Sequence, residues 1–302
     1  MKIGFPTIRL SLHPVEPGGR FDAESRARLF AWGHAAGFDG VELNENRFGM
    51  SSMSSAEVGE LRRQLAEATL EPAAVKTGGD LHTPGIAEKN ERAMIEGIRV
   101  ATELGAKLVS IGLGTPASCL GVADYERLGG KFCFGGSALA RGDAYTATAA
   151  ALRRVARVAE DAGVALSLEI APGSIADTGA SALRILQMVG SAALGINPDL
   201  GNLVTAYMEP EEDWRECLYA VSAHINHLDV KNVYGLRIPE LQRTIFKRGV
   251  LWDGVIDYRF VFAHLKQTAY EGYCIIESAG SGDMLFNFEQ GLQYVRKLRA
   301  EI

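Results

Sequence analysis

The chain contains few cysteines, and none of them stands at the CxxC spacing of a metal or redox site. Cys119, Cys133, Cys217 and Cys274 lie far apart in a sequence of 302 residues. This arrangement excludes a CxxC metal or redox site and favours reduced, mostly structural thiols in a cytoplasmic protein. A link between Cys119 and Cys133 is the alternative that the sequence leaves open.

Long apolar runs and concentrations of positive charge are also missing. No window approaches about 18 unbroken apolar residues, so we expect no transmembrane helix. The opening stretch MKIGFPTIRL has no long apolar run and no small-residue cleavage site, which excludes a signal peptide. Lysine and arginine form no patch and the net charge is -6, which excludes nucleic acid as a partner. With six histidines, the chain also lacks the histidine-rich metal site of a DNA-repair nuclease. A small neutral or weakly charged substrate fits this composition better.

What the sequence does contain is an alternation of short apolar runs with amphipathic segments. Glycines such as Gly37, Gly105 and Gly163 end predicted helices directly before the next run, as C-terminal capping glycines do. The predicted strands are Ile3–Ile8, Gly40–Leu43, Pro72–Lys76, Lys107–Leu113, Val164–Ile170, Leu194–Asp199, Ile225–Lys231 and Tyr273–Glu277. Eight such units predict one (β/α)8 TIM barrel domain over residues 1–302, with a doubly wound open sheet as the alternative.

Seven helical patterns separate these strands, and an eighth begins near Asn287 and runs to the end of the chain. Their predicted ranges are Ala23–Ala36, Ser55–Thr69, Ala87–Leu104, Ala144–Ala162, Ser181–Val189, Glu211–Ala223 and Tyr258–Tyr270. Two connections, Gly114–Asp143 and Asn232–Ile256, are longer than a barrel needs. Both follow strands, so we expect them to form lids or binding loops on the C-terminal face.

Carboxylates end four consecutive predicted strands, at Glu169, Asp199, Asp229 and Glu277. In a TIM barrel these ends meet at the catalytic face, and buried charges of one sign need compensation. A divalent cation is the simplest compensation, and oxygen ligands favour Mn²⁺ or Mg²⁺. Mn²⁺, Co²⁺ and Zn²⁺ are favoured if His227 is the ligand instead of Asp229. A structural ion-pair network, with Asp229 orienting His227, is the alternative.

Other polar residues at the same predicted face are candidates for contact with a substrate. His227 and Lys231 share a strand face with Asp229. His227 is a candidate substrate contact, and Lys231 anchors a substrate or neutralises the carboxylates. Lys76 ends the third strand, where burial would lower the pKa of its amine and suit it to acid–base catalysis; a solvent-exposed loop lysine is the alternative. His82, which follows a Gly-Gly turn, is a candidate contact. Asn44 or its neighbour Glu42 points inward, depending on a strand register that the sequence does not fix.

The chain resembles the xylose isomerase-like barrel family, also described as sugar phosphate isomerases and epimerases. The resemblance runs from GFDGVEL to the last helix and is strongest in LSLEI, NPDLGN and CIIESAG, with GVLWDGVIDY as a further match. It implies a TIM barrel with metal ligands at Glu169, Asp199 and Glu277. Two positions depart from the family pattern: Asp229 stands where a metal-binding histidine is expected, and Asn202 stands where the family commonly carries a second histidine.

Together these features predict a metal-dependent isomerase or epimerase of carbohydrate metabolism that acts on a ketose or keto-polyol. Glu169 and Glu277 are the predicted acid–base pair around an enediolate intermediate. A lyase that expels a β-substituent from the same intermediate is the main alternative, and a barrel that binds sugar without catalysis is another. Asn202 joins the predicted substrate contacts. Exposed barrel helices often pair in other proteins, so a homo-oligomer is also open.

Overall fold

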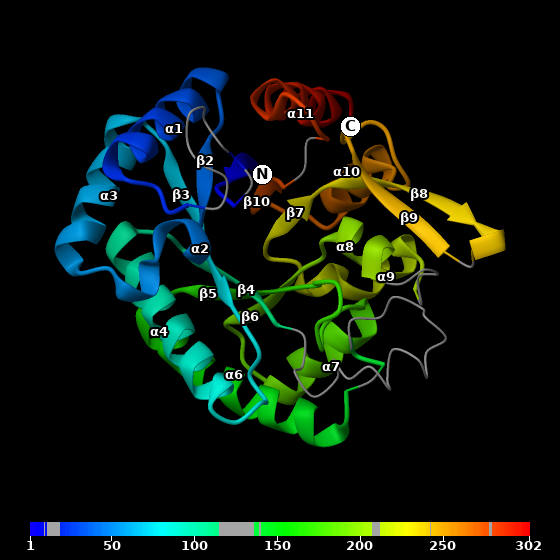
Figure 1. Cartoon of the computed structure of the whole chain (residues 1–302), viewed down its shortest axis with the longest axis horizontal. Coiled ribbons are helices and arrows are strands. Elements are labelled where there is room, and N and C mark those ends of the chain that lie inside the picture. Colours follow the sequence, from blue (N-terminus) through cyan, green and yellow to red (C-terminus); the bar gives the residue numbers. More distant parts are fainter. Residues whose placement is uncertain are drawn as a thin grey trace.

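The predicted barrel is confirmed in the computed structural model, which describes residues 1–8, 10, 19–114, 136–138, 140–206, 212–241, 243–277 and 280–302. Eight parallel strands run in the order β6-β5-β4-β3-β2-β1-β10-β7. Their bounds are β1 Lys2–Pro6, β2 Gly40–Asn44, β3 Glu71–Gly78, β4 Leu108–Gly112, β5 Ala165–Glu169, β6 Leu194–Asn197, β7 Leu228–Val230 and β10 Tyr273–Ile276. The first and last of these strands along the chain, β1 and β10, lie side by side (Figure 1).

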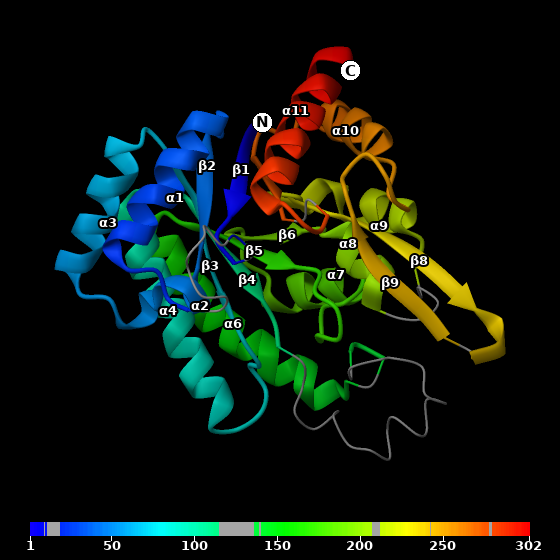
Figure 2. The ribbon, with the colours of Figure 1, turned by 45° about the horizontal axis from the view of Figure 1, so that its top comes forward.

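Helices surround this ring of strands on the outside (Figures 1 and 2). Their bounds are α1 Ala23–Ala36, α2 Glu45–Phe48, α3 Ser55–Glu67, α4 Ile86–Leu104, α6 Gly142–Ala162, α7 Gly179–Val189, α8 Leu200–Ala206, α9 Trp214–Val221, α10 Tyr258–Gln267 and α11 Met284–Glu301, with short 3-10 turns η1 Met50–Ser52, η3 Ser222–His224 and η4 Pro239–Leu241. None of the helices in these described ranges is both long and apolar enough to cross a membrane.

Local sequence signals explain where several helices begin and end. Asp22 precedes α1 and accepts a hydrogen bond from the Ser25 backbone N–H at 2.7 Å, as an N-cap residue does. Gly37 follows α1 with a φ of 94°, a left-handed conformation that an L side chain rarely adopts. Such caps determine where an outer helix begins and where it ends before the next inner strand.

The join between β6 and β7 differs from the other joins in the ring. Only the pair Ile196 and Ile225 forms a bridge between the two segments. Beyond it, the Asn197 side-chain oxygen accepts the Asp229 backbone N–H at 2.8 Å. A buried asparagine side chain thus replaces a backbone carbonyl where the barrel closes. Asn197 was not among the predicted functional residues, although it stands two positions before Asp199.

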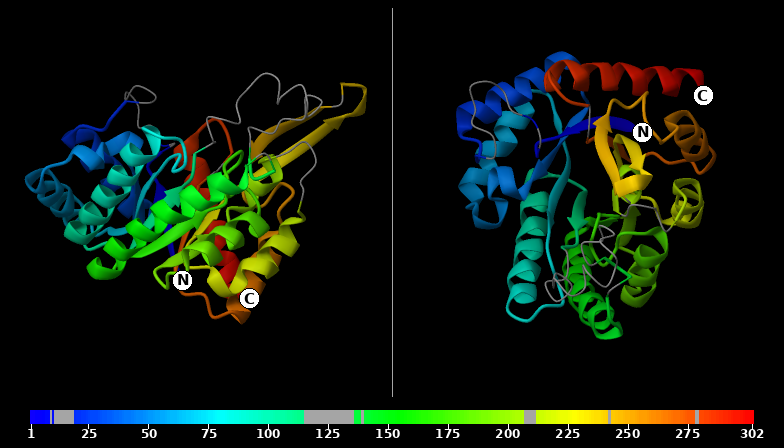
Figure 3. Two further views of the ribbon diagram at one scale, coloured as in Figure 1. Left: turned by 90° about the horizontal axis from the view of Figure 1, so that it is seen from below. Right: turned by 45° about the vertical axis from the view of Figure 1, so that its right-hand side comes forward.

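The predicted loop Asn232–Ile256 folds instead largely as an antiparallel hairpin of β8 Asn232–Ile238 and β9 Arg243–Gly249. This hairpin projects from the barrel, in yellow in Figure 3. Its β-branched and aromatic residues, among them Val233, Tyr234, Ile245 and Phe246, are a strand signal that the loop prediction overlooked. Most of the other long connection, Gly114–Asp143, lies outside the described residues, as do Cys119 and Cys133. Cys217 and Cys274 are buried free thiols.

Two adjacent strands, β3 and β4, approach closely at their C-terminal ends. A side chain added at Gly78 would place its Cβ 1.9 Å from the Gly112 carbonyl oxygen, which belongs to the neighbouring strand. We expect Gly78→Ala to lower the free energy of unfolding by about 1–3 kcal/mol, because overpacking forces the backbone to shift. Urea unfolding followed by circular dichroism measures this change.

Gly59 gives the matched control, because its added Cβ on the exposed face of α3 would meet nothing within 4 Å. We expect Gly59→Ala to raise stability by about 0.5–1 kcal/mol, the usual gain when alanine replaces glycine in a helix. Equal effects of the two substitutions would show that the approach of β3 to β4 is not tight.

Candidate metal centre and active site

A cavity of about 360 Å³ opens at the C-terminal end of the barrel strands. Its lining residues are Glu169, Pro172, Asn202, Thr205, Lys231, Val233, Phe246, Arg248 and Glu277. The carboxylates at its floor come from the ends of β5 and β10, and its wall includes the hairpin. This is the position at which TIM barrel enzymes carry their active sites.

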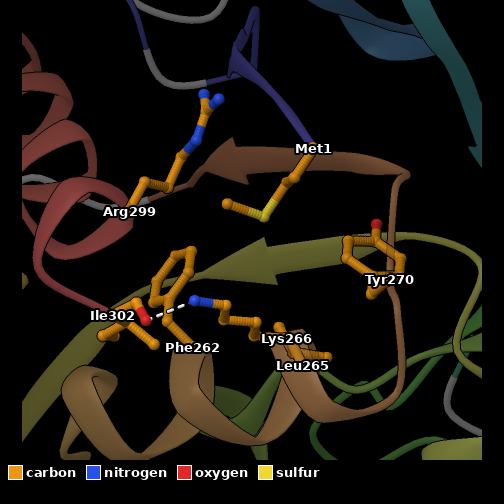
Figure 4. Close-up of a pocket in the computed structure, with 7 residues that line it drawn as sticks. All are labelled: Met1, Phe262, Leu265, Lys266, Tyr270, Arg299 and Ile302. Atoms are coloured by element: carbon orange, nitrogen blue, oxygen red, sulfur yellow. Dashed lines mark hydrogen bonds between the residues drawn. The ribbon is translucent and has the colours of Figure 1, made fainter.

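A second cavity of about 230 Å³ lies near the opposite end of the barrel, between α10 and α11 (Figure 4). Phe262 and Leu265 give it an apolar wall, and Lys266 contacts the backbone oxygen of Ile302. No aspartate or glutamate lines this cavity. The cavity at the C-terminal mouth differs in this respect, because Glu169 and Glu277 line it.

The four predicted metal ligands converge in the structure. Glu169, Asp199, Asp229 and Glu277 each offer an oxygen within 4.8 Å of the others, and all four are buried. Asp199 does not end its strand as predicted, because β6 stops at Asn197. Instead Asp199 precedes α8, where its Oδ1 accepts the Asn202 backbone N–H at 3.3 Å. The capping position holds this carboxylate toward the other three.

Two buried lysines lie among these carboxylates. Lys231 Nζ is 2.5 Å from Glu277 Oε2 and 2.7 Å from Asp199 Oδ2. Lys76 Nζ is 2.7 Å from Asp229 Oδ2 and 3.1 Å from Glu169 Oε2. Each lysine thus connects two members of the cluster, and each has less than a tenth of its side chain exposed. Lys231 neutralises carboxylates in this structure, and it also lines the cavity.

The expected low pKa of Lys76 is wrong. Burial alone would lower that pKa, but the surrounding carboxylates outweigh burial and raise it well above its usual value. Lys231 is also shifted upward, because Asp199 and Glu277 outweigh its burial. Both amines are therefore charged at neutral pH, so Lys76 serves as a fixed cation and not as a neutral base.

The carboxyl groups separate into two kinds. Burial raises the pKa of Glu169, and it raises the pKa of Asp199 well above its ordinary value. Asp229 is as deeply buried, yet Lys76 and His227 outweigh that burial and lower its pKa to about 2. Glu169 thus has the raised pKa that suits proton transfer, whereas Asp229 is a permanent anion.

A second cluster lies directly beside the first. His227 Nε2 is 3.2 Å from Glu42 Oε2 and 3.5 Å from Asp229 Oδ1. Burial would lower the pKa of His227, but the hydrogen bonds to Asp229 and Glu42 raise it to about 9. The register of β2 thus points Glu42 inward, which the sequence left undecided. The direction is shown by the contact of Glu42 with the buried His227.

The charges of the two clusters test whether a cation fits. Five buried carboxylates face two lysines and His227. When all five are ionised and His227 is protonated, two negative charges stay without compensation. Asp229 Oδ1 is buried, and its contact with His227 Nε2 is long, at 3.5 Å. A divalent cation would supply the missing charge, and the oxygen-rich donor set suits a hard ion.

The predicted substrate contacts fall into two groups. Asn202 and Lys231 line the cavity, and Asn202 also donates to Glu169 Oε1 at 2.9 Å and to the Ile170 carbonyl at 3.0 Å. Asn44, His82 and His227 lie outside the cavity lining. Asn44 caps α2 by accepting the Asn46 backbone N–H, and His82 Nδ1 is 2.7 Å from Asp80 Oδ1. The geometry therefore gives these three residues structural partners and does not place them against a substrate.

Comparison with known proteins agrees with this geometry. A structure of a xylose isomerase-like TIM barrel protein from Mycobacterium smegmatis in complex with magnesium has a TM-score of 0.77 and 19% identity, covering 98% of this chain and 96% of that one. A 3-keto-D-glucoside 4-epimerase from E. coli has a TM-score of 0.69 and 15% identity over 98% and 99%. A probable 3-DHS dehydratase from Bacillus anthracis has a TM-score of 0.69 and 17% identity over 97% and 99%.

At these identities the solved structures establish the fold, and no curated protein matches the sequence. The sequence profile described as "Xylose isomerase-like TIM barrel" matches residues 30–298, which is most of the chain. Together with the eight-stranded ring and the carboxylates at its mouth, this match shows that the chain belongs to the xylose isomerase-like TIM barrel family.

Proposed function

We propose that this protein is a divalent-metal-dependent isomerase or epimerase of a ketose or keto-polyol, with Glu169 and Glu277 as its acid–base pair. One observation supports the assignment above others. Glu169 and Glu277 belong to the four-carboxylate cluster and also line the cavity, whereas Asp199 and Asp229 are not among the lining residues. Two carboxylates thus face both the metal position and the space for a substrate.

Glu169, Asp199, Asp229 and Glu277 would hold the metal, with Mn²⁺ or Mg²⁺ as the best match and Co²⁺ or Zn²⁺ as alternatives. When bound, such an ion polarises a carbonyl and stabilises the negative charge that develops when a neighbouring C–H loses its proton. Similar barrels include a magnesium complex and a 3-keto-D-glucoside epimerase, which supports the proposal by analogy.

The chain's own residues prepare the two glutamates for proton transfer. Asn202 and Lys76 hold the two oxygens of Glu169, one each. Lys231, which directly follows β7, is paired with Glu277 at the end of the neighbouring strand β10. Because β5 and β10 are separated in the ring by β6 and β7, the glutamates approach the cavity from different sides. One can remove a proton while the other returns it at a different position or face.

Elimination is the second candidate reaction, and one observation favours it. The Lys231 ammonium lines the cavity beside Glu277 and carries a fixed positive charge. A cation in that place can stabilise a departing hydroxide or alkoxide. A lyase and an isomerase share the first proton abstraction, so the same site serves either outcome.

Proton exchange tests the proposed function directly. We expect the purified protein with Mn²⁺ or Mg²⁺ to catalyse deuterium uptake in D₂O at a carbon beside a carbonyl, in a panel of ketoses and keto-polyols followed by NMR. A chelator should abolish the uptake, and the products distinguish an epimer from an eliminated product. Exchange that survives complete metal removal, or a protein that binds no divalent metal, would contradict the proposal.

A further inference from the structure

The hairpin presents two chemically different faces, and one of them forms the wall of the cavity. Val233 and Arg248 are directly paired across β8 and β9, so their side chains share a face. Phe246 stands two residues before Arg248 and shares that face too. All three line the cavity, and Phe246 also packs against the barrel core.

The opposite face of the hairpin points away from the cavity. Its residues Tyr234, Leu236 and Ile245 are exposed, with 37%, 63% and 50% of their surfaces accessible. Lys247 is paired with Tyr234 on this outer face. Lys247 and Arg248 are neighbouring cations on opposite faces of the hairpin, and of the two only Arg248 lines the cavity.

Arg248 is not needed to neutralise the floor of the cavity. Glu277 is already paired with Lys231, and Glu169 with Lys76. A divalent cation would supply the charge that these lysines leave uncompensated. Arg248 is exposed and lines the cavity. Its positive charge on the wall is therefore not required to balance the carboxylates at the floor.

We propose that Arg248 recognises an anionic group, a carboxylate or a phosphate, at the end of the substrate remote from the reacting carbon. A guanidinium binds either anion through two parallel hydrogen bonds. The ring of Phe246, held by its packing against the core, lies on the same wall and covers the apolar C–H side of the sugar chain. The substrate class is thus an acidic ketose or keto-polyol, which is more charged than the composition suggested.

This inference rests on the proposed function for the identity of the sugar, and its test uses binding instead of turnover. The probes are D-fructose, D-fructuronate and D-fructose 6-phosphate, which carry a neutral, a carboxylate and a phosphate group at the same end. Calorimetry with the Mg²⁺-loaded protein compares the wild type with Arg248→Met and with Lys247→Met. The second variant removes the adjacent cation from the outer face of the hairpin.

We expect the wild type and Lys247→Met to bind at least one anionic ketose about 10- to 100-fold more tightly than D-fructose, the usual range for hydrogen bonds to a charged group. Arg248→Met should lose that preference and keep its affinity for D-fructose. Preference for one anion over the other identifies the recognised group.

The inference is overturned if neither anion binds more tightly than D-fructose, including the case in which no probe binds, or if Arg248→Met keeps the preference. These results are independent of proton exchange. An enzyme of neutral sugars would show metal-dependent deuterium uptake without a preference for anions. A barrel that binds acidic sugars without catalysis would show the preference without uptake.

Discussion

Replacing Glu277 by Gln is expected to reduce metal-dependent proton exchange by about 10²–10⁴-fold, the usual contribution of a positioned acid or base. Glu169→Gln should have a similar effect, because both carboxylates line the cavity. The amide keeps the shape of the side chain but cannot accept the substrate proton. Single-turnover NMR in D₂O at saturating metal measures the loss, and circular dichroism confirms that the fold is retained.

Glu271→Gln is the matched control for both variants. Glu271 is exposed and lies just before β10, at the opposite end of the strand that Glu277 follows. Its substitution changes the net charge equally and should leave the exchange rate within about twofold of the wild type, since surface changes far from the site have small effects. Normal exchange in Glu169→Gln or in Glu277→Gln would remove that residue from the mechanism.

Replacing Lys76 by Met is expected to lower the free energy of unfolding of the metal-free protein by about 3–5 kcal/mol, the range for removing one partner of a buried ion pair. The Lys76 amine lies between Asp229 and Glu169, so its loss leaves neighbouring buried negative charges without their cation. Urea unfolding in the presence of a chelator measures this loss. Added Mg²⁺ should restore more stability in Lys76→Met than in the wild type, since the variant carries more uncompensated negative charge.

Two further variants make the Lys76 result interpretable. Lys76→Arg keeps a cation at the position and should lose less stability than Lys76→Met. Lys107→Met removes an exposed lysine just before β4 and should change stability by no more than about 0.5 kcal/mol. A loss below about 1 kcal/mol in Lys76→Met would show that Lys76 is not the main compensating charge of the cluster.

The barrel and the carboxylate cluster could be predicted from the sequence because both depend on periodic features. A strand must alternate with a helix for the barrel to close, so the apolar runs locate the ends at which Glu169 and Glu277 stand. Asp229 could be placed for the same reason. The prediction for Asp199 gave the right end of the barrel but the wrong element, because strand and helix-cap positions next to a proline look alike in one sequence.

The remaining features depend on contacts between segments that are distant in the sequence. The inward direction of Glu42 is shown by its contact with His227, which is 185 residues away in the sequence. The high pKa of Lys76 arises from four carboxylates that lie on other strands or directly after one. Arg248 was overlooked because the hairpin was interpreted as a loop, and the cavity wall exists only once Val233 and Arg248 are paired.

Because the barrel closes through the Asn197 side chain, the strands are not paired equally around the ring. Other neighbouring strands share ladders of three or more paired residues. In contrast, one bridge joins β6 to Ile225, which precedes β7, and one side-chain hydrogen bond joins β6 to β7 itself. Asp199 follows β6 and Asp229 lies on β7, so two of the four carboxylates lie on the two sides of the junction that has the fewest pairing contacts. An ion bound by both carboxylates would link β6 to β7 across this junction. Metal binding would then contribute both to catalysis and to the closure of the barrel.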